Sequence, residues 1–274
     1  MKALPVPAER QGFVAFFMEA YMTLERFFAA HPKVALGFSG GVDSSYLLYA
    51  AQRYGADVKP YFIKTVFQPQ FELKDAARLA EQLGVHLEVL SADILQTAEV
   101  ARNGARRCYH CKRELFDRLR AAALADGYGV LLDGSNASDD AGDRPGMQAL
   151  EELEVLSPLR LCGITKTEVR RLSREAGLFT WNKPAYACLA TRVPAGTAIT
   201  EEDLSRVEKA EEFLFSLGFS DFRGRLMGEN TRAARVQLPE SQMQSALHAR
   251  EKIIAGLSGF SAVLLDLAPR PQEK

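Results

Sequence analysis

The stretch SGGVDSS, residues 39–45, lies directly between an apolar run at 34–38 and a helical pattern at 46–52. A short apolar run bounded by Gly and Ser is typical of a buried strand, so the stretch joins a strand to a helix. Its glycines allow a tight turn, while N–H groups at a helix start and serine hydroxyls attract anions. The sequence therefore predicts a phosphate site made by Ser39, Gly40, Gly41, Asp43, Ser44 and Ser45.

Asp43 distinguishes this loop from other phosphate loops. The stretch has no GK[ST] ending, which excludes a Walker-type site. A carboxylate adds negative charge to a phosphate cradle, and Mg²⁺ bound between Asp43 and the phosphates would explain its presence. A plain Gly-rich turn with an Asp or Ser cap and no ligand is the alternative.

Strand-like and helical patterns alternate along the first two thirds of the chain. The strand-like runs after the loop lie at 61–66, 87–90 and 130–132. The helical patterns lie at 13–30, 72–83, 112–124 and 165–176. This alternation predicts an α/β fold with a parallel sheet and helices on both faces.

A different order of elements begins near Thr200. Helical patterns and strand-like runs follow at 200–217, 222–226, 234–238, 242–255 and 262–267. The order predicts a small α+β domain, joined through the segment around Pro194 and Gly196. We expect one domain over residues 1–196 and a second over 197–274, the latter for substrate binding or oligomerisation.

Composition limits the classes of partner. The 274 residues carry a net charge of -1 and have an isoelectric point near 6.5. No overall field therefore attracts the chain to nucleic acid or to an anionic membrane. The sequence has no uninterrupted apolar run of about 18 residues and no secretory signal pattern. We expect a cytoplasmic protein with no membrane partner, and the charge disfavours a nucleic-acid partner.

A second polar segment, LLDGSNASDD at 131–140, coincides with the end of a strand-like run. Ligands bind at the carboxyl ends of strands in open parallel sheets, so Asp139 and Asp140 can face the cleft of the phosphate loop. A solvated turn rich in Asp and Asn is the alternative. Asp143 and Arg144 are candidates for substrate contacts or for a surface ion pair.

Two cysteines stand close together in Cys108-Tyr109-His110-Cys111, just before a helical pattern. Neighbouring cations and a helix start favour thiolates, the form that binds metals or attacks electrophiles. With Cys188, these thiols suit an iron–sulfur cluster with one open iron, since each cluster iron takes one protein thiolate. Zinc with His110 as an extra ligand, or ordinary reduced thiols, are the alternatives. Cys162 has apolar neighbours and is interpreted as core filling.

Several motifs together resemble one family. SGGVDSS is similar to the SGGxDS signature of the PP-loop ATP pyrophosphatases. With RRCYHCK, DGSNASDDAGDRPG and WNKPAYACLATRVPAGT, it resembles the LarE family of ATP-dependent sulfur transferases over nearly the whole chain. The resemblance implies a PP-loop (adenine nucleotide alpha hydrolase-like) domain that binds ATP and Mg²⁺. It also implies adenylation of a carboxylate of a pyridinium dicarboxylate mononucleotide and sulfur insertion, in building the nickel-pincer nucleotide cofactor.

The cysteines match one of two kinds in that family. Some members sacrifice a single cysteine, and others hold a 4Fe-4S cluster with an added sulfide on three cysteines. Cys108, Cys111 and Cys188 resemble the metal ligands of the cluster-bearing kind. Cys188 is therefore one candidate catalytic residue, and Asp43, through its Mg²⁺, is the other. Cys188 falls one position after the sacrificial cysteine, where this chain has Ala187, and this departure argues against the sacrificial mechanism.

Arginines are the candidate ligands of a substrate phosphate. Arg223 and Arg225 alternate on the run 222–226, so both project from the same face of a strand. Such guanidinium groups bind phosphate through bidentate contacts. The resemblance implies this role for Arg192, Arg223 and Arg225, with Arg235 as a further candidate. A solvated charged face of the strand is the alternative for these arginines. The resemblance separately implies that the protein is a homo-oligomer.

Two other functions fit the same residues. A PP-loop tRNA thiolase can carry a similar cysteine pattern, but a basic surface and further zinc-binding cysteines would be expected, and the composition shows neither. A regulatory protein that holds ATP or AMP without turnover is the second alternative. Binding of tRNA across salt concentrations distinguishes the first, and pyrophosphate release at background level favours the second.

Overall fold

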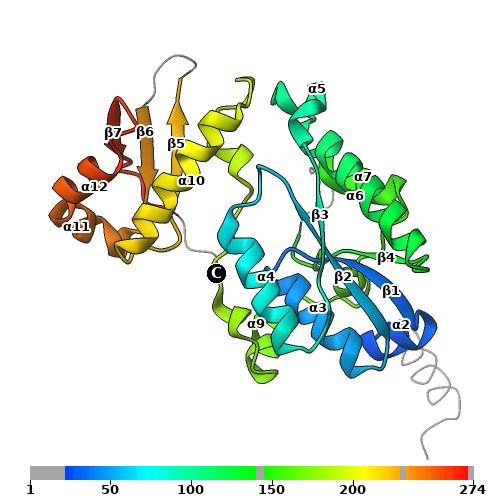
Figure 1. Ribbon diagram of the computed structural model, residues 1–274. Helices are drawn as coiled ribbons and strands as arrows, with labels where there is room; N and C mark the ends of the chain where they lie inside the picture. Colours follow the sequence, from blue (N-terminus) through cyan, green and yellow to red (C-terminus); the bar gives the residue numbers. More distant parts are fainter. Residues whose placement is uncertain (1–21, 140–144, 229–232, 271–274) are drawn as a thin grey trace, which may run out of the picture.

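The computed structural model describes residues 22–139, 145–228 and 233–270 (Figure 1). The larger part of the chain forms a parallel sheet in the order β3-β2-β1-β4. Its strands are β1 (Lys33–Gly37), β2 (Asp57–Lys64), β3 (Glu88–Ser91) and β4 (Leu131–Leu132). All four overlap the predicted runs, and the predicted parallel sheet is confirmed.

Helices cover both faces of this sheet, as predicted (Figure 1). On one face lie α2 (Leu24–Ala30), α3 (Val42–Arg53), α4 (Gln70–Gln82), α8 (Pro158–Leu161) and α9 (Lys166–Glu175). On the other lie α6 (Arg107–Ala125) and α7 (Pro145–Glu152). Successive strand residues point to opposite faces, so Val34 and Leu36 join the first core while Ala35 joins the second.

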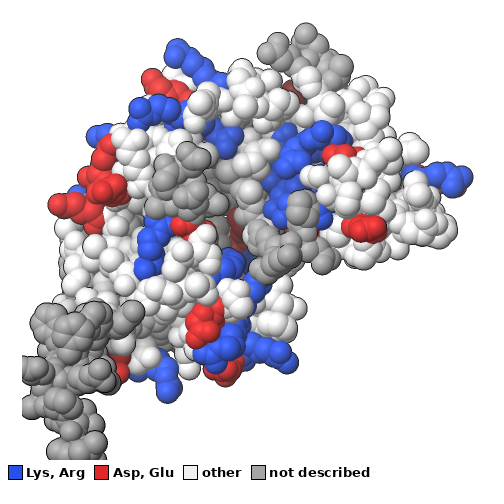
Figure 2. Space-filling view, turned by 180° about the vertical axis from the view of Figure 1, so that it is seen from behind, with Lys and Arg blue, Asp and Glu red and all other residues white. Residues whose placement is uncertain are grey.

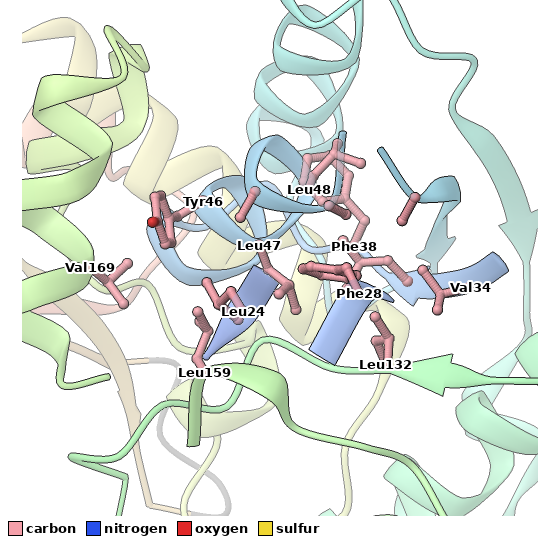
Figure 3. Packing of buried hydrophobic residues seen from close by; sticks show 14 of the residues in the cluster. Leu24, Phe28, Val34, Phe38, Tyr46, Leu47, Leu48, Leu132, Leu159 and Val169 are labelled. Atoms are coloured by element: carbon pink, nitrogen blue, oxygen red, sulfur yellow. The ribbon is translucent and has the colours of Figure 1, made fainter. Parts of the chain in front are cut away.

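The first core holds the end of β1 against α3 (Figure 3). Val34 and Phe38 pack in the same cluster as Leu47 and Leu48, and each of the four is at most 3% exposed. Burying a side chain of this size contributes about 1.5–3 kcal/mol. The phosphate loop therefore spans two elements that packing keeps in place.

Two expectations about the helices need correction. α6 begins at Arg107, earlier than the predicted 112, because Tyr109 is buried and its hydroxyl donates to Glu152 Oε2 on α7 at 2.6 Å. Cys108 and Cys111 therefore lie in the first turns of α6 and not before it.

Some of the predicted features lie outside the described residues. They are residues 13–21 of the helix predicted over 13–30, and Asp140, Asp143 and Arg144.

The C-terminal part forms the predicted α+β unit around a sheet in the order β5-β6-β7. β5 runs antiparallel to β6, and β6 runs parallel to β7. The elements are α10 (Glu201–Ser216), β5 (Arg223–Met227), β6 (Ala233–Gln237), α11 (Glu240–His248), α12 (Arg250–Gly256) and β7 (Ala262–Leu265). The single helix predicted over 242–255 is wrong: Ala249, at φ -88° and ψ 7°, ends α11 and begins α12. Ala246 on α11 and Ile253 on α12 both lie in the core of this unit.

A fourth apolar cluster joins the two parts of the molecule. Phe67 and Ile94, which follow β2 and β3, pack in one cluster with Leu189, Val193 and Ile199. Short turns contribute residues to it: α5 (Ala98–Ala101) and the 3₁₀ turns at Ile94–Gln96 and Leu189–Arg192. A further 3₁₀ turn, Phe179–Asn182, packs instead against α9. The chain around Cys188 is thereby held at the carboxyl end of the large sheet, where ligands bind. The domain boundary at 196/197 stays a prediction.

The described helices also bear on the membrane question. None of the helices within 22–139, 145–228 and 233–270 is both long enough and apolar enough to cross a membrane.

Candidate functional site

The loop after β1 turns sharply at Gly40. Its φ of +69° lies in the left-handed region that glycine adopts without strain, and a Cβ there would lie 3.1 Å from the backbone of Ala76 on α4. The Gly41 N–H donates to Ser39 Oγ at 3.3 Å, and the Ser39 N–H donates to Ser44 Oγ at 3.3 Å. Backbone amides and serine hydroxyls therefore gather at the start of α3, as a phosphate site needs.

A cavity of about 620 Å³ opens on this loop. Its volume lies within the usual range for small-molecule sites, roughly 300–1,000 Å³. Its lining includes Ser39, Asp43, Ser44, Cys108, Lys112, Asp133, Ser135, Asp139, Ala187 and Cys188. The structure thus brings the loop, the acidic segment and two of the three predicted ligand cysteines to one cavity.

Ser45 is placed differently from the other loop serines. It is fully buried, and its Oγ has no hydrogen-bond partner among the described residues. Ser39 and Ser44 are among the residues that line the cavity, and Ser45 is not. A phosphate contact from the Ser45 hydroxyl stays a prediction.

Asp43 has two side-chain partners at the edge of this cavity. Its Oδ1 accepts a hydrogen bond from Asn136 Nδ2 at 3.2 Å, and its Oδ2 lies 2.5 Å from Lys166 Nζ. Burial raises the pKa of Asp43, while the charge and hydrogen bond of Lys166 lower it in part. Sequence reasoning missed Lys166, although the helix that it begins was predicted.

The acidic segment after β4 packs directly on the phosphate loop. A Cβ on Gly134 would lie 2.9 Å from the Ser44 backbone nitrogen, so this approach requires glycine. Asp133 is buried and accepts hydrogen bonds from Ser135 Oγ at 2.5 Å and from Ser157 Oγ at 2.6 Å. Residues 133–136 therefore pack against the loop, and Asp133, Ser135 and Asp139 line the cavity as predicted, while Ala137 and Ser138 form an exposed turn.

The three candidate ligand thiols approach one another from two parts of the chain. Cys108 is exposed, while Cys111 and Cys188 are half-buried. Burial, together with the charges of Cys188 and Cys108, raises the pKa of Cys111 to about 12. Burial also raises the pKa of Cys188, against the opposing effect of Arg107. The expectation that nearby cations favour thiolates is therefore wrong for Cys111 and Cys188, because desolvation outweighs them.

Arg107 joins the cysteine helix to the segment after Cys188. Its Nη1 donates to Asn103 Oδ1 at 2.6 Å and to the Ala190 carbonyl at 3.0 Å, and its Nη2 lies 3.5 Å from Cys108 Sγ. Asn103 in turn donates to the Pro194 carbonyl at 2.8 Å. This network holds the two cysteine-bearing segments in a fixed relation.

Arg192 lies in the protein interior and is paired there. Its Nε and Nη2 donate to Glu211 at 2.7 and 3.2 Å, and both side chains are at most 2% exposed. Its Nη1 also donates to the Ala187 carbonyl at 3.1 Å. Glu211 further accepts from the Gly224 N–H at 2.9 Å and from the Tyr186 hydroxyl. In this arrangement Arg192 fixes the backbone beside Cys188.

Further arginines cluster next to Arg192. Arg223 is 5% exposed and donates to the Ala185 carbonyl at 2.6 Å, while Arg225 donates to Gln237 Oε1 at 2.9 Å. Burial and the charges of Arg192 and Arg270 lower the pKa of Arg223 to about 10. Arg225 is paired in register with Arg235 on β6. Figure 2 shows Lys and Arg side chains gathered beside the hollow between the two parts of the molecule.

Crowded guanidinium groups of this kind attract anions such as phosphate. The role of Arg192, Arg223 and Arg225 as its ligands stays a prediction. Among the described residues, no group of three or more His, Cys, Asp and Glu side chains is already arranged to hold a metal ion.

Comparisons with known proteins extend over most of the chain. The family model described as asparagine synthase matches residues 23–135. A protein of Synechocystis sp. described as uncharacterized is 38% identical over 81% of this chain and 82% of its own. The pyridinium-3,5-bisthiocarboxylic acid mononucleotide synthase of Lactiplantibacillus plantarum is 33% identical over 86% of both chains. A tRNA-specific 2-thiouridylase of Thermotoga sp. is 27% identical over 55% of this chain and 54% of its own.

Proposed function

Because the chain belongs to the LarE family, we propose that it adenylates a carboxylate of a pyridinium dicarboxylate mononucleotide with ATP and then inserts sulfur. Membership makes the chain an ATP-using enzyme, so a regulatory protein without turnover no longer fits. The product would be a thiocarboxylated mononucleotide on the way to the nickel-pincer cofactor. The observation that carries the proposal is the single cavity shared by the phosphate loop, Cys108 and Cys188.

The chemistry follows the layout of that cavity. An oxygen of the substrate carboxylate attacks the α-phosphorus of ATP. The bond between the α-phosphorus and the oxygen that bridges it to the β-phosphorus breaks, and pyrophosphate leaves with that oxygen. Amides and hydroxyls of the loop, with Ser39 and Ser44 on the cavity wall, would stabilise the charge on pyrophosphate. A sulfur nucleophile then attacks the activated carbonyl carbon, and AMP leaves with the former carboxylate oxygen.

Carboxylates on the cavity wall are suited to Mg²⁺. Asp43 and Asp139 both line the cavity, and carboxylate oxygens are the ligands that this ion prefers. Asp43 Oδ2 is now paired with Lys166 Nζ at 2.5 Å. We propose that Lys166 moves from Asp43 toward the phosphates when the Mg²⁺ complex of ATP binds, so that both cations face pyrophosphate.

We propose that the three thiols hold a 4Fe-4S cluster, since cysteine thiolates are its usual ligands. Cys108 and Cys188 line one cavity, and Cys111 lies one helical turn from Cys108 on α6. When bound, such a cluster would supply an added sulfide as the sulfur source. The protein's own contribution is to keep the cysteine segments together through Arg107, which contacts the Ala190 carbonyl and Cys108.

A substrate phosphate fits the arginine cluster. Arg225 is the least buried of the three predicted ligands, and Arg235 lies opposite it on β6. We propose that Arg225 holds the phosphate directly and that the buried Arg223, whose Nη1 and Nη2 donate to the Phe222 and Ala185 carbonyls, contributes its charge beside it. Arg192 would contribute its charge from behind, because Glu211 and the Ala187 carbonyl occupy its donors. The mononucleotide would thus reach from the small sheet to the cavity on the large one.

Anaerobic purification followed by iron, sulfide and zinc analysis tests the sulfur source. About four irons per chain, lost on Cys111→Ser and retained on Cys162→Ser, support the cluster. Cys162 is the matched control because it packs against the first core. Zinc in place of iron, or metal-free thiols that still support turnover, would contradict the cluster and leave His110-assisted zinc or plain thiols.

A tRNA thiolase remains the second candidate, since a tRNA-specific 2-thiouridylase matches about half of this chain. The net charge of -1 argues against it. Titration of tRNA at several salt concentrations should show no specific complex.

The proposal also includes a cytoplasmic location, where the free thiols stay reduced. It further includes a homo-oligomeric state, which size-exclusion chromatography with light scattering would measure.

A further inference from the structure

Lys183 connects the phosphate loop to the segment that carries Cys188. Its Nζ donates to the Gly40 carbonyl at 3.2 Å and lies 2.6 Å from Asp75 Oδ2 on α4. The side chain is only 14% exposed. We propose that Lys183 is a positioning residue that holds the peptide between Gly40 and Gly41 with its N–H turned toward the phosphates of the bound nucleotide.

The geometry of the peptide unit carries this inference. In a trans peptide the carbonyl and the following N–H point in opposite directions, and no described peptide bond is cis. The Gly40 carbonyl is directed at Lys183, so the Gly41 N–H is directed the other way. There it donates to Ser39 Oγ at 3.3 Å, and Ser39 lines the cavity. The N–H therefore faces the side on which a phosphate would bind.

This peptide needs a specific partner to stay in that orientation. It lies between two glycines, which permit backbone orientations that other residues exclude. Reversal of the peptide would turn the Gly40 carbonyl toward the cavity, where its partial negative charge would repel a phosphate. A hydrogen bond from a charged ammonium to the Gly40 carbonyl opposes the reversal, and Asp75 keeps that ammonium in place.

The position of Lys183 in the chain links the two halves of the site. The following residues are fixed from the small sheet, because Arg223 donates to the Ala185 carbonyl and Arg192 to the Ala187 carbonyl. Any movement of this segment would change the support of the Gly40 carbonyl. The orientation of the phosphate loop thus depends on the same segment that presents Cys188 to the cavity.

The inference rests on the phosphate-binding part of the proposed function. Isothermal titration calorimetry tests it without turnover, by measuring the affinity of the protein for Mg²⁺-pyrophosphate and for AMP. Lys183→Met should weaken pyrophosphate binding about tenfold, the scale of one hydrogen bond to a charged group. AMP has no β- or γ-phosphate for the Gly41 N–H and should bind almost unchanged. Lys183→Arg keeps a charged donor and should restore most of the pyrophosphate affinity.

Lys74→Met is the matched control, because Lys74 is an exposed residue on the same helix as Asp75. It removes the same charge and should leave both affinities unchanged. Equal weakening of pyrophosphate and AMP by Lys183→Met, or unchanged pyrophosphate affinity, would overturn the role of Lys183. Absence of pyrophosphate binding by the unaltered protein would instead overturn the phosphate site itself.

Discussion

The Lys166 ammonium lies 2.5 Å from Asp43 Oδ2, although 123 residues separate the two in the chain. Asp43 is in the first turn of α3, Lys166 begins α9, and these two helices pack against each other. The contact places a positive charge beside the carboxylate that would hold Mg²⁺. Lys166 thus belongs to the proposed ATP site although no motif around it indicates this.

Lys166→Met should lower the rate of pyrophosphate release about a hundredfold, the typical effect of removing one group that stabilises developing charge. Burial already raises the pKa of Asp43 and Lys166 opposes that rise, so its removal should raise the pKa further. Protonated Asp43 binds no metal, and the acid limb of the kcat/KM profile should move to higher pH. Lys166→Arg should keep the profile near its original position, and an unshifted limb in Lys166→Met would contradict the assignment.

Cys188→Ser should separate the two half-reactions. Adenylation uses the phosphate loop, so pyrophosphate release in the presence of substrate should continue, while formation of thiocarboxylate stops. Quantifying pyrophosphate and, by mass spectrometry, the thiocarboxylated product checks both. Cys162→Ser, whose thiol packs against the first core, should leave both unchanged. Full product formation by Cys188→Ser would remove Cys188 from the sulfur-transfer step.

Glu211→Gln should destabilise the fold, because it leaves the Arg192 guanidinium buried without a counter-charge. Arg192 and Glu211 are at most 2% exposed, and breaking a buried pair of this kind costs about 3 kcal/mol or more. Urea unfolding followed by circular dichroism measures the loss. Glu175→Gln removes an exposed partner of Arg171 and should leave the midpoint nearly unchanged. Equal midpoints for the two variants would contradict a structural role of the Arg192–Glu211 pair.

Glu72 should make folding stability depend on pH. Burial raises its pKa from 4.5 to about 7, against the opposing charges of Lys183 and Arg192. Between these values the folded chain holds a proton that the unfolded chain has lost, so the contribution of Glu72 to stability is present below pH 4.5 and falls as the pH rises toward 7. Glu72→Gln should flatten that part of the curve in urea titrations. Parallel curves for the two proteins would show that Glu72 does not titrate in this way.

Local patterns were sufficient for most of the fold. The runs at 34–38 and 61–66 alternate with helical patterns, and both overlap strands of the parallel sheet. The second strand, β2, begins earlier than its run, at Asp57, and includes Pro60. The residues that were misjudged depend on contacts distant in sequence. Tyr109 extends α6 because it reaches Glu152 on α7, and periodicity over 112–124 contains no sign of that contact.

The candidate site shows the same division between local and distant information. SGGVDSS marks the phosphate loop by itself, because its glycines and serines act within one turn. The partners of that loop come from elsewhere: Lys166 pairs with Asp43, and Lys183 supports Gly40. The family resemblance also suggested Arg192 as a phosphate ligand, but the sequence could not show that Glu211 lies against it in the interior.

Product analysis tests the central claim most directly. The protein would be incubated anaerobically with Mg²⁺, ATP and the pyridinium dicarboxylate mononucleotide, and the nucleotides and phosphates would be separated by ion-exchange chromatography. Attack on the α-phosphorus predicts AMP and pyrophosphate in equal amounts, both dependent on the mononucleotide. ADP and orthophosphate as the products would contradict cleavage at the α-phosphate, and with it the proposed use of the SGGVDSS loop.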